Sequence, residues 1–467
     1  MHIKDIESHI GKEISISGFV DVRRDHGKLI FIDLRDETGK VQMVALPEHT
    51  EAHEYAEKLR PEWVITVTGM VNDRPERMRK EGINGSVEIE VRGITVLAEA
   101  ETPVFDVGQD TRMIDEEVRL KYRPLDLRSV RMQKNIRLRS DWVHACRNYL
   151  DEHDFTEIET PLLSKATAEG SRDFIVPSRL HPGEFYALPQ SPQQYKQLLM
   201  VGGFERYYQL ARALRDEDLR ADRGFEHTQI DIEMAYTNSE TIRNLVEEML
   251  IKSAESLGYT IKEKPFPRIP YTEAMEKYGS DKFDMRTDAE KEANILAYAW
   301  VVNFPFFEKN DSGGLNPDGS PSWTFTHNPF SMPKEEYIQD LLEGKNIENI
   351  IADQFDLVCN GFEVGGGSMR AHKPDILKAT YKVFGYSEEE IQNSIGHILE
   401  AFSFGVPPHG GIALGVERNI MILAQEEALR EVQAFPMTAG GKTSVMNAPN
   451  TLPPEDLLTF GISVKKK

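Results

Sequence analysis

Apolar and polar side chains alternate with a period of two through much of the first hundred residues, which is the pattern of half-buried β-strands. In EISISGFVDV, the residues Ile14, Ile16, Val20 and Val22 are expected on one face. Four further runs share the alternation: LIFIDLR (29–35), KVQMVAL (40–46), WVITVTGMV (63–71) and SVEIEVRGITVL (86–97). The pattern predicts five strands that close into a small barrel.

A short helix is predicted between the third and fourth strands, over TEAHEYAEKL (50–59). Five strands interrupted by a helix at that place are typical of barrels that bind oligonucleotides. A five-stranded barrel without a ligand would show the same alternation. We therefore expect an OB-type barrel over residues 1–100, and its ligand stays open at this point.

The rest of the chain has a different composition. Residues 101–125 combine prolines and charges without a period, which is typical of a hinge. Residues 126–467 mix strand and helix patterns and predict one large α+β domain, with a long helix near 129–152. The stretch 119–147 holds nine Lys or Arg and two acids. These cations could contact phosphates or form a solvated helix face.

The charge and composition of the chain limit its function classes. Lys plus Arg number 55 and Asp plus Glu 77, for a net charge of −22. This excludes a basic protein that coats nucleic acid through its overall charge, but not a protein with a local RNA-binding patch. We expect no membrane span and no signal peptide, because the chain lacks a run of about 18 apolar residues and begins with MHIKDIESHI. Cys146 and Cys359 are too few for a disulfide framework or a structural zinc site, which favours a cytoplasmic protein.

The strongest chemical signal is a charged loop between two strand-like runs, within residues 207–236. Arg215 ends the first run, and Glu217 follows two residues later. A guanidinium at this place can hold phosphate oxygens that gain charge during attack, while the acid orients an amine or a metal. A hairpin held by salt bridges would give the same pattern.

Two further clusters contain groups that bind anions. The run ALPQSPQQYKQLLM places Ser191, Gln193 and Lys196 on a turn followed by a helix. The run PPHGGIALGVERN ends a glycine-punctuated strand with Arg418 at a helix start, where a phosphate-binding cation is well placed.

A fourth cluster, DQFDLVCNGFEVGGGSMR, suggests a metal site. Asp356 and Glu363 lie seven residues apart on what the pattern predicts to be one buried strand. Two carboxylates in apolar surroundings favour an Mg²⁺ site beside phosphates. The glycines that follow would let a ligand approach the backbone before Arg370, although such glycines usually serve turns.

Three ordered segments resemble the signatures of one enzyme family. YLDEHDFTEIETPLL (149–163) resembles the first, RALRDEDLRADR with FEHTQID the second, and GIALGVER the third. With QSPQQYKQLLM, NGFEVGGGSMR and the barrel, they make nearly the whole chain similar to the bacterial aspartyl type of class II aminoacyl-tRNA synthetases. The resemblance implies an OB-type anticodon-binding domain (1–100), a hinge (101–125) and a class II catalytic domain (126–467) with an antiparallel sheet flanked by helices. It also implies a homodimer with Pro161 at the interface.

The resemblance implies a ligase that uses ATP and Mg²⁺ to activate L-aspartate and transfers it to tRNA(Asp), with tRNA(Asn) as a second candidate acceptor. The implied catalytic residues are Arg215, Glu217 and Arg418, and ATP binding adds His227, Gln229 and Glu363 to these. The implied aspartate-binding residues are Glu169, Ser191, Gln193, Lys196, Asp231, His327 and Arg370. The implied metal ligands are Asp356 and Glu363, and the implied anticodon residues are Arg24, His26, Phe31 and Gln42.

Two of these residues give a physical reason for aspartate as the substrate. Lys196 and Arg370 would surround one small side chain with two cations, which fits the β-carboxylate of aspartate. An amide would leave buried charge uncompensated. The alternative is that Lys196 only pairs with Asp231, which would leave Arg370 unexplained.

The chain departs from the family pattern at three places. The large domain that bacterial members insert after residues 271–286 is reduced to a short segment near 287–299. His227 stands where members usually have a phenylalanine that stacks on adenine, so we expect weaker stacking with pH sensitivity near about 6.5. Asn328, after His327, replaces the second histidine of a loop that distinguishes aspartate from asparagine. Fidelity is therefore open.

The tRNA acceptor and the enzyme class have alternatives. His26 is typical of members that also charge tRNA(Asn), whereas Arg77 stands in a region where those members usually have glycine. The chain could also be an asparaginyl-tRNA synthetase, a synthetase-derived asparagine synthetase or a non-catalytic paralogue. Lys196 with Arg370 disfavours the first, the anticodon residues disfavour the second, and the complete set of catalytic groups disfavours the third.

Overall fold

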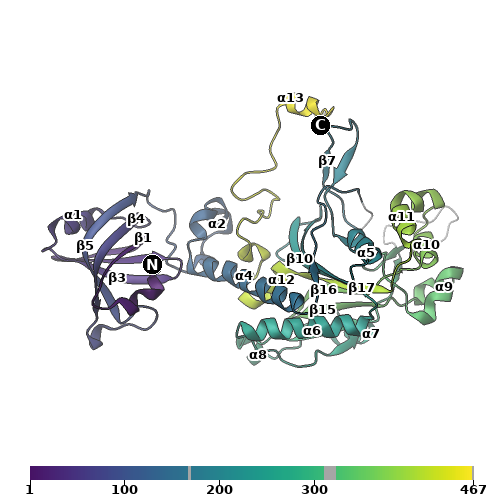
Figure 1. Ribbon diagram of the computed structural model, residues 1–467, viewed down its shortest axis with the longest axis horizontal. Helices are drawn as coiled ribbons and strands as arrows, with labels where there is room; N and C mark the ends of the chain where they lie inside the picture. Colours follow the sequence, from purple (N-terminus) through teal and green to yellow (C-terminus); the bar gives the residue numbers. More distant parts are fainter. Residues whose placement is uncertain (167–169, 310–321, 465–467) are drawn as a thin grey trace. The chain divides into compact units, whose positions relative to one another are not determined.

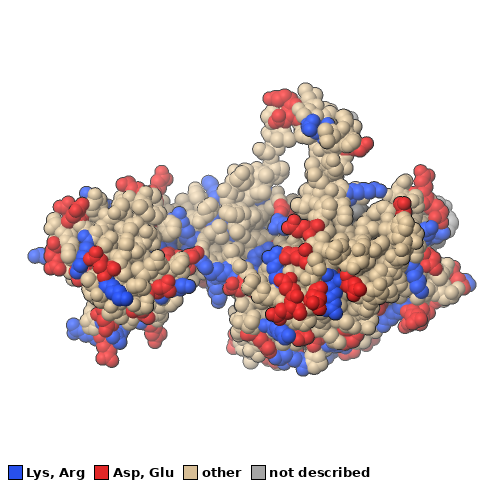
Figure 2. Space-filling view, in the orientation of Figure 1, with Lys and Arg blue, Asp and Glu red and all other residues tan. Residues whose placement is uncertain are grey.

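The computed structural model describes residues 1–166, 170–309 and 322–464. The chain divides into two compact units, Met1–Lys134 and Asn135–Lys467 (Figure 1). Acidic and basic side chains are interspersed on the face of each unit that Figure 2 shows. None of the helices in the described part of the chain has both the length and the apolar content of a membrane span.

Within residues 1–166, all of which are described, five strands close into a barrel in the order β1-β2-β3-β5-β4, as predicted. The elements are β1 (Glu13–His26), β2 (Leu29–Asp36), β3 (Gly39–Ala45), α1 (Thr50–Lys58), β4 (Val64–Asp73) and β5 (Val87–Ala98). Ile14, Ile16 and Val20 are buried in its core as expected, but Val22 is 38% exposed. The expectation for Val22 was wrong because β1 is irregular between Val20 and Val22, which shifts the alternation.

Short helices occupy part of the segment that was expected to be an irregular hinge. They are η3 (Thr111–Met113), α2 (Glu116–Lys121) and α3 (Arg123–Asp126), and the long α4 (Val130–Asp151) follows. The side chains of Asp110 and Asp115 cap η3 and α2 by accepting backbone N–H groups. Helices this short do not span the window in which a helical period is recognised, so the pattern missed them. The domain bounds drawn from the sequence stay a prediction.

The basic stretch 119–147 forms ion pairs inside the chain. Arg123 is fully buried and donates to Asp126 at 2.6 Å. On α4, Arg139 lies 2.9 Å from the carboxylate of Glu417. These two cations therefore help to hold the fold.

The described part of the second unit is built on an eight-stranded sheet in the order β11-β12-β15-β16-β17-β10-β9-β6. Its central strands are antiparallel as predicted, whereas the outer pairs β11·β12 and β9·β6 are parallel. The strands are β6 (Thr156–Glu157), β9 (Arg206–Leu214), β10 (Glu226–Ala235), β11 (Arg268–Pro270), β12 (Tyr298–Val302), β15 (Gln354–Cys359), β16 (Phe362–Met369) and β17 (His409–Gly415).

The two faces of this sheet have different roles. Along β10, Ile230 and Ile232 point into the apolar core, to which α4, α6 (Ser239–Ser256) and α12 (Val416–Ala424) contribute side chains. Gln229 and Asp231 alternate with them and line a cavity. The period-two pattern of β10 therefore places polar groups on the opposite side from the helices.

The remaining described elements are short strands, helices and 3-10 turns, of which η1 and η2 belong to the first unit. Two small antiparallel sheets are formed by β7 (Ile175–Pro177) with β8 (Phe185–Ala187) and by β13 (Phe307–Lys309) with β14 (Trp323–Phe325). The helices are α5 (Gln193–Val201), α7 (Tyr271–Tyr278), α8 (Asp288–Glu292), α9 (Ile338–Glu343), α10 (Pro374–Val383), α11 (Glu388–Phe402) and α13 (Pro454–Thr459). Short 3-10 turns are η1 (Ile3–His9), η2 (Glu76–Met78), η4 (Glu335–Tyr337), η5 (Ile347–Asn349) and η6 (Leu429–Val432).

Candidate active site

A cavity of about 1110 Å³ brings together polar clusters that lie far apart in the sequence of the second unit. Predicted site residues in its walls are Ser191, Gln193, Lys196, Arg215, Glu217, His227, Gln229, Asp231, His327, Glu363, Arg370 and Arg418. Asp356 is 1% exposed and lies directly behind Gly366 of the wall. Glu169 lies outside the described residues. The roles of these residues stay predictions, but their shared cavity is a finding.

Arg215 follows the last residue of β9 and directs its guanidinium into the cavity without an ion-pair partner among the described residues. Its backbone N–H donates to the carbonyl of Phe225 at 2.8 Å, which closes the base of the charged loop. Among the described residues, its side chain donates only to the carbonyl of Gln190, at 3.3 Å. Glu217 pairs with Arg223 at 3.0 Å, so the loop does contain a salt bridge, but Arg215 takes no part in it. Arg215 can therefore hold an anionic ligand.

Arg418 lies in the first turn of α12, as predicted, at the same end of the cavity. It donates to the carbonyl of Glu363 at 2.6 Å and to the carbonyl of Asp222 at 3.1 Å. The two carbonyls orient the guanidinium, and the Asp222 carboxylate at 3.4 Å compensates part of its charge. This end of the cavity is thus suited to a phosphate chain.

His227 faces this cationic end of the cavity from β10. Burial, followed by the positive charges of Arg215 and Arg418, lowers the pKa of His227 to about 3. The imidazole is therefore neutral at ordinary pH. The expectation of pH sensitivity near its ordinary pKa was wrong, because burial and three nearby guanidinium groups disfavour a further positive charge.

A buried cluster of four charges forms the other end of the cavity. The Lys196 Nζ lies 3.1 Å from Asp231 Oδ1 and 3.1 Å from Glu233 Oε2. Arg370 donates to both carboxylate oxygens of Glu233, at 2.9 and 3.0 Å, and to Ser368 Oγ at 2.7 Å. All four charged residues are at most 2% exposed. The cluster is neutral overall, with two cations and two anions.

Glu233 is the residue that sequence reasoning missed. The expectation of two cations reserved for a ligand was incomplete, because burying both without partners would cost too much free energy. Although burial acts in the opposite direction, Arg370 and Lys196 lower the pKa of Glu233 to about 2. Burial raises the pKa of Asp231 against the attraction of Lys196. The signal was available, since Asp231 and Glu233 lie two apart on β10 and so share its cavity face.

Asp356 and Glu363 lie on two adjacent strands, β15 and β16, and not on one strand as predicted. A turn at Asn360 and Gly361, both with positive φ (52° and 92°), reverses the chain between them. A Cβ built on Gly366 would lie 3.2 Å from Asp356 Oδ1 and 3.7 Å from Glu363 Oε1. Only glycine leaves the space between these carboxylates and the cavity open.

The surroundings of Asp356 fit a divalent cation. Its Oδ2 atom is buried, has no hydrogen-bond partner among the residues that the structure describes, and lies 3.5 Å from His327 Nδ1. Burial raises the pKa of Asp356 to about 7, with His327 opposing the shift and Glu363 adding to it. Glu363 pairs with Lys282 at 3.0 Å, a second residue that the sequence reasoning missed. An unpaired carboxylate oxygen beside a second carboxylate is the donor set that Mg²⁺ prefers.

The four predicted anticodon residues lie on the neighbouring strands β1, β2 and β3 of the barrel. Phe31 lies opposite Arg24 on neighbouring strands, and its ring meets His26 edge-on at 5.5 Å. Arg24 makes two hydrogen bonds to Asp33, at 2.8 and 2.9 Å, and so is not free. The Lys80 Nζ donates to the Gln42 side chain at 3.2 Å, which adds a cation that was not predicted. An aromatic ring with adjacent hydrogen-bonding groups is suited to a single-stranded base.

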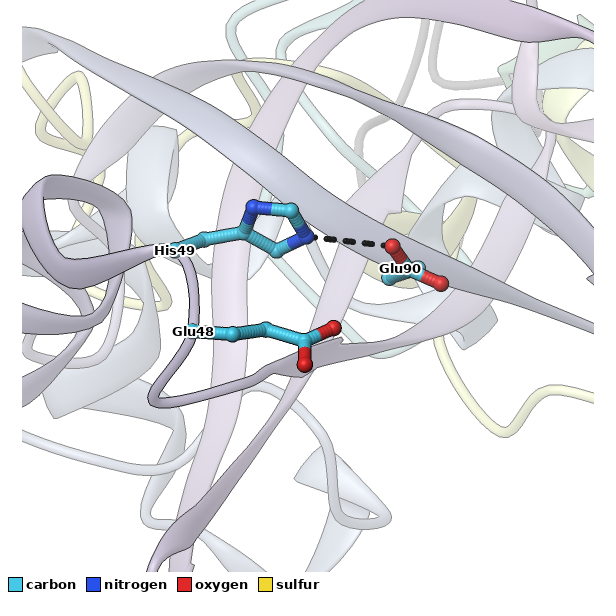
Figure 3. A group of neighbouring side chains, drawn as sticks. All are labelled: Glu48, His49 and Glu90. Atoms are coloured by element: carbon cyan, nitrogen blue, oxygen red, sulfur yellow. Dashed lines mark hydrogen bonds and ion pairs between the residues drawn. The ribbon is translucent and has the colours of Figure 1, made fainter.

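A separate group of ligand-type side chains lies elsewhere on the barrel (Figure 3). His49 Nε2 contacts Glu90 Oε1 at 3.1 Å, and Asn72 donates to the other oxygen of Glu90 at 3.2 Å. Glu48 is exposed beside them. The hydrogen bond to His49 lowers the pKa of Glu90 despite its partial burial. These contacts tie the turn before α1 to β5 and account for the group without an ion.

Comparisons with known proteins agree with both units. The family model described as tRNA synthetases class II (D, K and N) matches residues 115–439, and an OB-fold nucleic acid binding domain matches residues 14–97. A relative from Rubrobacter xylanophilus, named aspartate–tRNA(Asp/Asn) ligase, is 37% identical over 98% of this chain and 95% of its own length. One from Corynebacterium jeikeium with the same name is 37% identical over 98% of this chain and 96% of its own.

The first alignment is 582 residues long against 467 in this chain, so the relative contains residues that have no counterpart here. An aspartyl-tRNA synthetase structure from Entamoeba histolytica matches with a TM-score of 0.73, 21% identity and coverage of 93% of this chain and 91% of that one. An asparaginyl-tRNA synthetase structure from Pyrococcus horikoshii, complexed with asparaginyl-adenylate, matches with a TM-score of 0.71 and 22% identity. The match covers 92% of this chain and 96% of that one. These structures support the fold. With its barrel and its charged cavity, the chain belongs to the class II tRNA synthetases of the D, K and N group.

Proposed function

We propose that this chain is an ATP-dependent aspartate–tRNA ligase. The observation that carries the proposal is one cavity with a cationic end at Arg215 and Arg418 and a cation-containing end at Lys196 and Arg370. The first end suits a nucleoside triphosphate, and the second suits a small acidic side chain. The names of the relatives support the same reaction.

The first reaction joins aspartate to AMP. An oxygen of the aspartate α-carboxylate bonds to the α-phosphorus of ATP, the bond between the α-phosphorus and the bridging oxygen breaks, and pyrophosphate leaves. Arg215 neutralises charge on the α-phosphate, and Arg418 holds the γ-phosphate. No side chain needs to act as a nucleophile or a base, because the attacking carboxylate is already ionised.

Mg²⁺ bound by Asp356 and Glu363 would neutralise phosphate charge during this step. The chain supplies both carboxylates from β15 and β16, with Lys282 paired to Glu363. In the second reaction, a ribose hydroxyl at the 3′ end of tRNA attacks the acyl carbon, the bond between that carbon and the phosphate oxygen breaks, and AMP leaves as its phosphate takes up the hydroxyl proton.

Aspartate is preferred to asparagine because its β-carboxylate would accept hydrogen bonds from both cations of the buried charge cluster. A carboxylate can accept from both Lys196 and Arg370, whereas an amide offers one acceptor oxygen and turns N–H groups towards cations. The likeness to an asparaginyl-tRNA synthetase structure, at 22% identity, concerns the fold. Pyrophosphate exchange measured with aspartate, asparagine and lysine in turn tests this choice.

The main test replaces Arg215. Aspartate-dependent ATP–pyrophosphate exchange should fall by at least ~10²-fold in Arg215→Ala, the loss expected for a donor that acts in the transition state. Arg212→Ala is the matched control, because Arg212 lies on β9 three residues before Arg215, is exposed and pairs with Glu226. Near-normal exchange in Arg215→Ala would refute its catalytic role.

The barrel is proposed to bind the anticodons of tRNA(Asp) and tRNA(Asn). Phe31 would stack on a base while His26 and Gln42 contact its edge. The relatives named aspartate–tRNA(Asp/Asn) ligase support the broader acceptor range, although Arg77 does not fit that group's usual pattern. Charging assays with each purified tRNA decide this, and aspartate incorporation confined to tRNA(Asp) would reject the broader range.

We also propose a homodimer through the segment that contains Pro161. Pro161 is exposed, Leu162 and Leu163 are 50% and 53% exposed, and the chain then pairs with Ala187 at the end of β8. Phe185 on that strand is 48% exposed, so the apolar surface continues onto the sheet of β7 and β8. Sedimentation analysis tests the dimer.

Two free, buried cysteines agree with the proposed cytoplasmic location.

A further inference from the structure

Four polar side chains form a continuous hydrogen-bonded chain that leads from the cavity into the core of the second unit. Asn328 Nδ2 donates to Gln193 Oε1 at 3.4 Å, and Gln193 Nε2 donates to Gln197 Oε1 at 3.2 Å. Gln197 Nε2 lies 3.3 Å from His409 Nε2. Asn328 and Gln193 line the cavity, whereas Gln197 and His409 are fully buried.

Backbone groups fix the direction of this chain at both ends. The N–H of Phe330 donates to Asn328 Oδ1 at 2.8 Å, so Asn328 must turn its amino group towards Gln193. His409 Nδ1 lies 2.8 Å from the carbonyl of Pro407, which can only accept, so Nδ1 carries the proton. Burial lowers the pKa of His409 to about 4, which keeps the ring neutral and leaves Nε2 as an acceptor.

With both ends fixed, each amide between them has one orientation in which all of its hydrogen bonds in this series are made. Gln197 must donate to His409 and accept from Gln193. Gln193 must then direct its amino group at Gln197 and keep its carbonyl oxygen on the side of Asn328 and the cavity. Reversing Gln193 would set its oxygen against the Gln197 oxygen in a buried place and its amino group against that of Asn328.

We infer that Asn328, Gln197 and His409 are positioning residues that hold the Gln193 side chain with its carbonyl oxygen towards the cavity, as the acceptor for the α-ammonium group of the amino-acid substrate. This inference rests on the proposed function. Gln193 and Lys196 are three apart on α5 and so share a helix face, with side chains about 5–6 Å apart. An amino acid whose carboxylate is held by Lys196 therefore has its ammonium group within reach of Gln193.

The inference explains why two neutral amides are buried beside four charges. An ammonium group can only donate, so it gains from a fixed acceptor and would be opposed by an amino group. A carbonyl oxygen has a second lone pair, which remains for the substrate after Asn328 donates to the first. The fixed direction thus distinguishes an α-amino acid from an analogue without the amino group.

The test compares aspartate with succinate, which keeps both carboxylates of aspartate but lacks the ammonium group. In Gln197→Met, the side chain keeps its length and loses the hydrogen bonds, so Gln193 can turn. We expect the KM for aspartate in pyrophosphate exchange to rise on the order of tenfold, the loss of one hydrogen bond to a charged group. The inhibition constant of succinate and the KM for ATP should stay within about twofold, on the same reasoning.

Gln194→Met is the matched control, because Gln194 lies on the same helix but hydrogen-bonds His397 and not the side chains that hold Gln193. Asn328→Ala provides a second variant at the accessible end, with the same expected split between aspartate and succinate.

An equal loss of aspartate and succinate binding, or no loss of either, would overturn the positioning role. Wild-type protein is measured in the same series. Absence of aspartate-dependent exchange there would reject the proposed function, whereas normal wild-type exchange with unchanged variants rejects only the positioning role.

Discussion

Replacing Glu233 by glutamine tests the buried charge cluster most directly. Glu233 contacts both Lys196 and Arg370, with three distances between 2.9 and 3.1 Å. Glutamine has nearly the same size and shape, so the substitution removes one negative charge and leaves no cavity. The variant keeps two buried cations with only Asp231 as a carboxylate partner.

The expected effect is a large loss of stability. Removing one partner of a buried ion pair costs about 3–5 kcal/mol, because the remaining charge stays desolvated without compensation. Exposed pairs contribute less than about 1 kcal/mol. Glu226→Gln is therefore the matched control, since Glu226 lies on the same strand and pairs with Arg212 at the surface.

Urea unfolding followed by circular dichroism, without ligand and at one protein concentration, measures both variants. The free energy of unfolding should fall by about 3–5 kcal/mol in Glu233→Gln and by less than about 1 kcal/mol in Glu226→Gln. Equal values for the two variants would refute the argument that Glu233 compensates the buried cations.

The difference in unfolding free energy between wild type and Glu233→Gln should also depend on pH. The pKa of Glu233 is lowered from 4.5 to about 2, so the folded protein holds this carboxylate ionised where the unfolded chain protonates it. The stabilisation is full above pH 4.5 and is lost as the pH falls towards 2. The difference between wild type and Glu233→Gln should therefore shrink over that range, and a constant difference would contradict the assigned ionisation.

Two further outcomes are expected. Because the pKa of His227 lies at about 3, the KM for ATP should show the same dependence on pH between about 5.5 and 8 in wild type and in His227→Phe; a wild-type inflection near about 6.5 that the variant lacks would contradict its neutral state. Asp356→Asn should raise the Mg²⁺ concentration for half-maximal exchange on the order of 10-fold or more, because a carboxylate ligand is lost; an unchanged Mg²⁺ titration would remove Asp356 from the metal site.

Several elements were predictable because their signals are local. The barrel strands alternate residue by residue, and burial of one face makes that alternation visible in the sequence. Arg418 was placed correctly at a helix start, because a glycine-rich strand ends immediately before it. Val22 was misplaced because one irregularity in β1 shifts the alternation without a composition signal.

The hairpin that separates Asp356 from Glu363 was missed although the sequence contains its signal. Asn360-Gly361 between apolar runs is a strong two-residue turn signal, and both residues do have positive φ. The short helices between residues 101 and 125 gave no such signal, since they depend on aspartate caps and not on a period.

The sequence by itself determined which chemical groups this protein has and in which local segments they lie. Arg215, Lys196, Arg370 and Arg418 are all identifiable from the sequence as candidate anion-binding groups. Only the tertiary structure decided how these charges are compensated. Glu233 and Arg370 are 137 residues apart, and their contact arises because β10 and β16 both pair with β17 in one sheet. Local patterns report the faces of single elements, whereas the free energy of a buried charge depends on neighbours that the chain brings together only on folding.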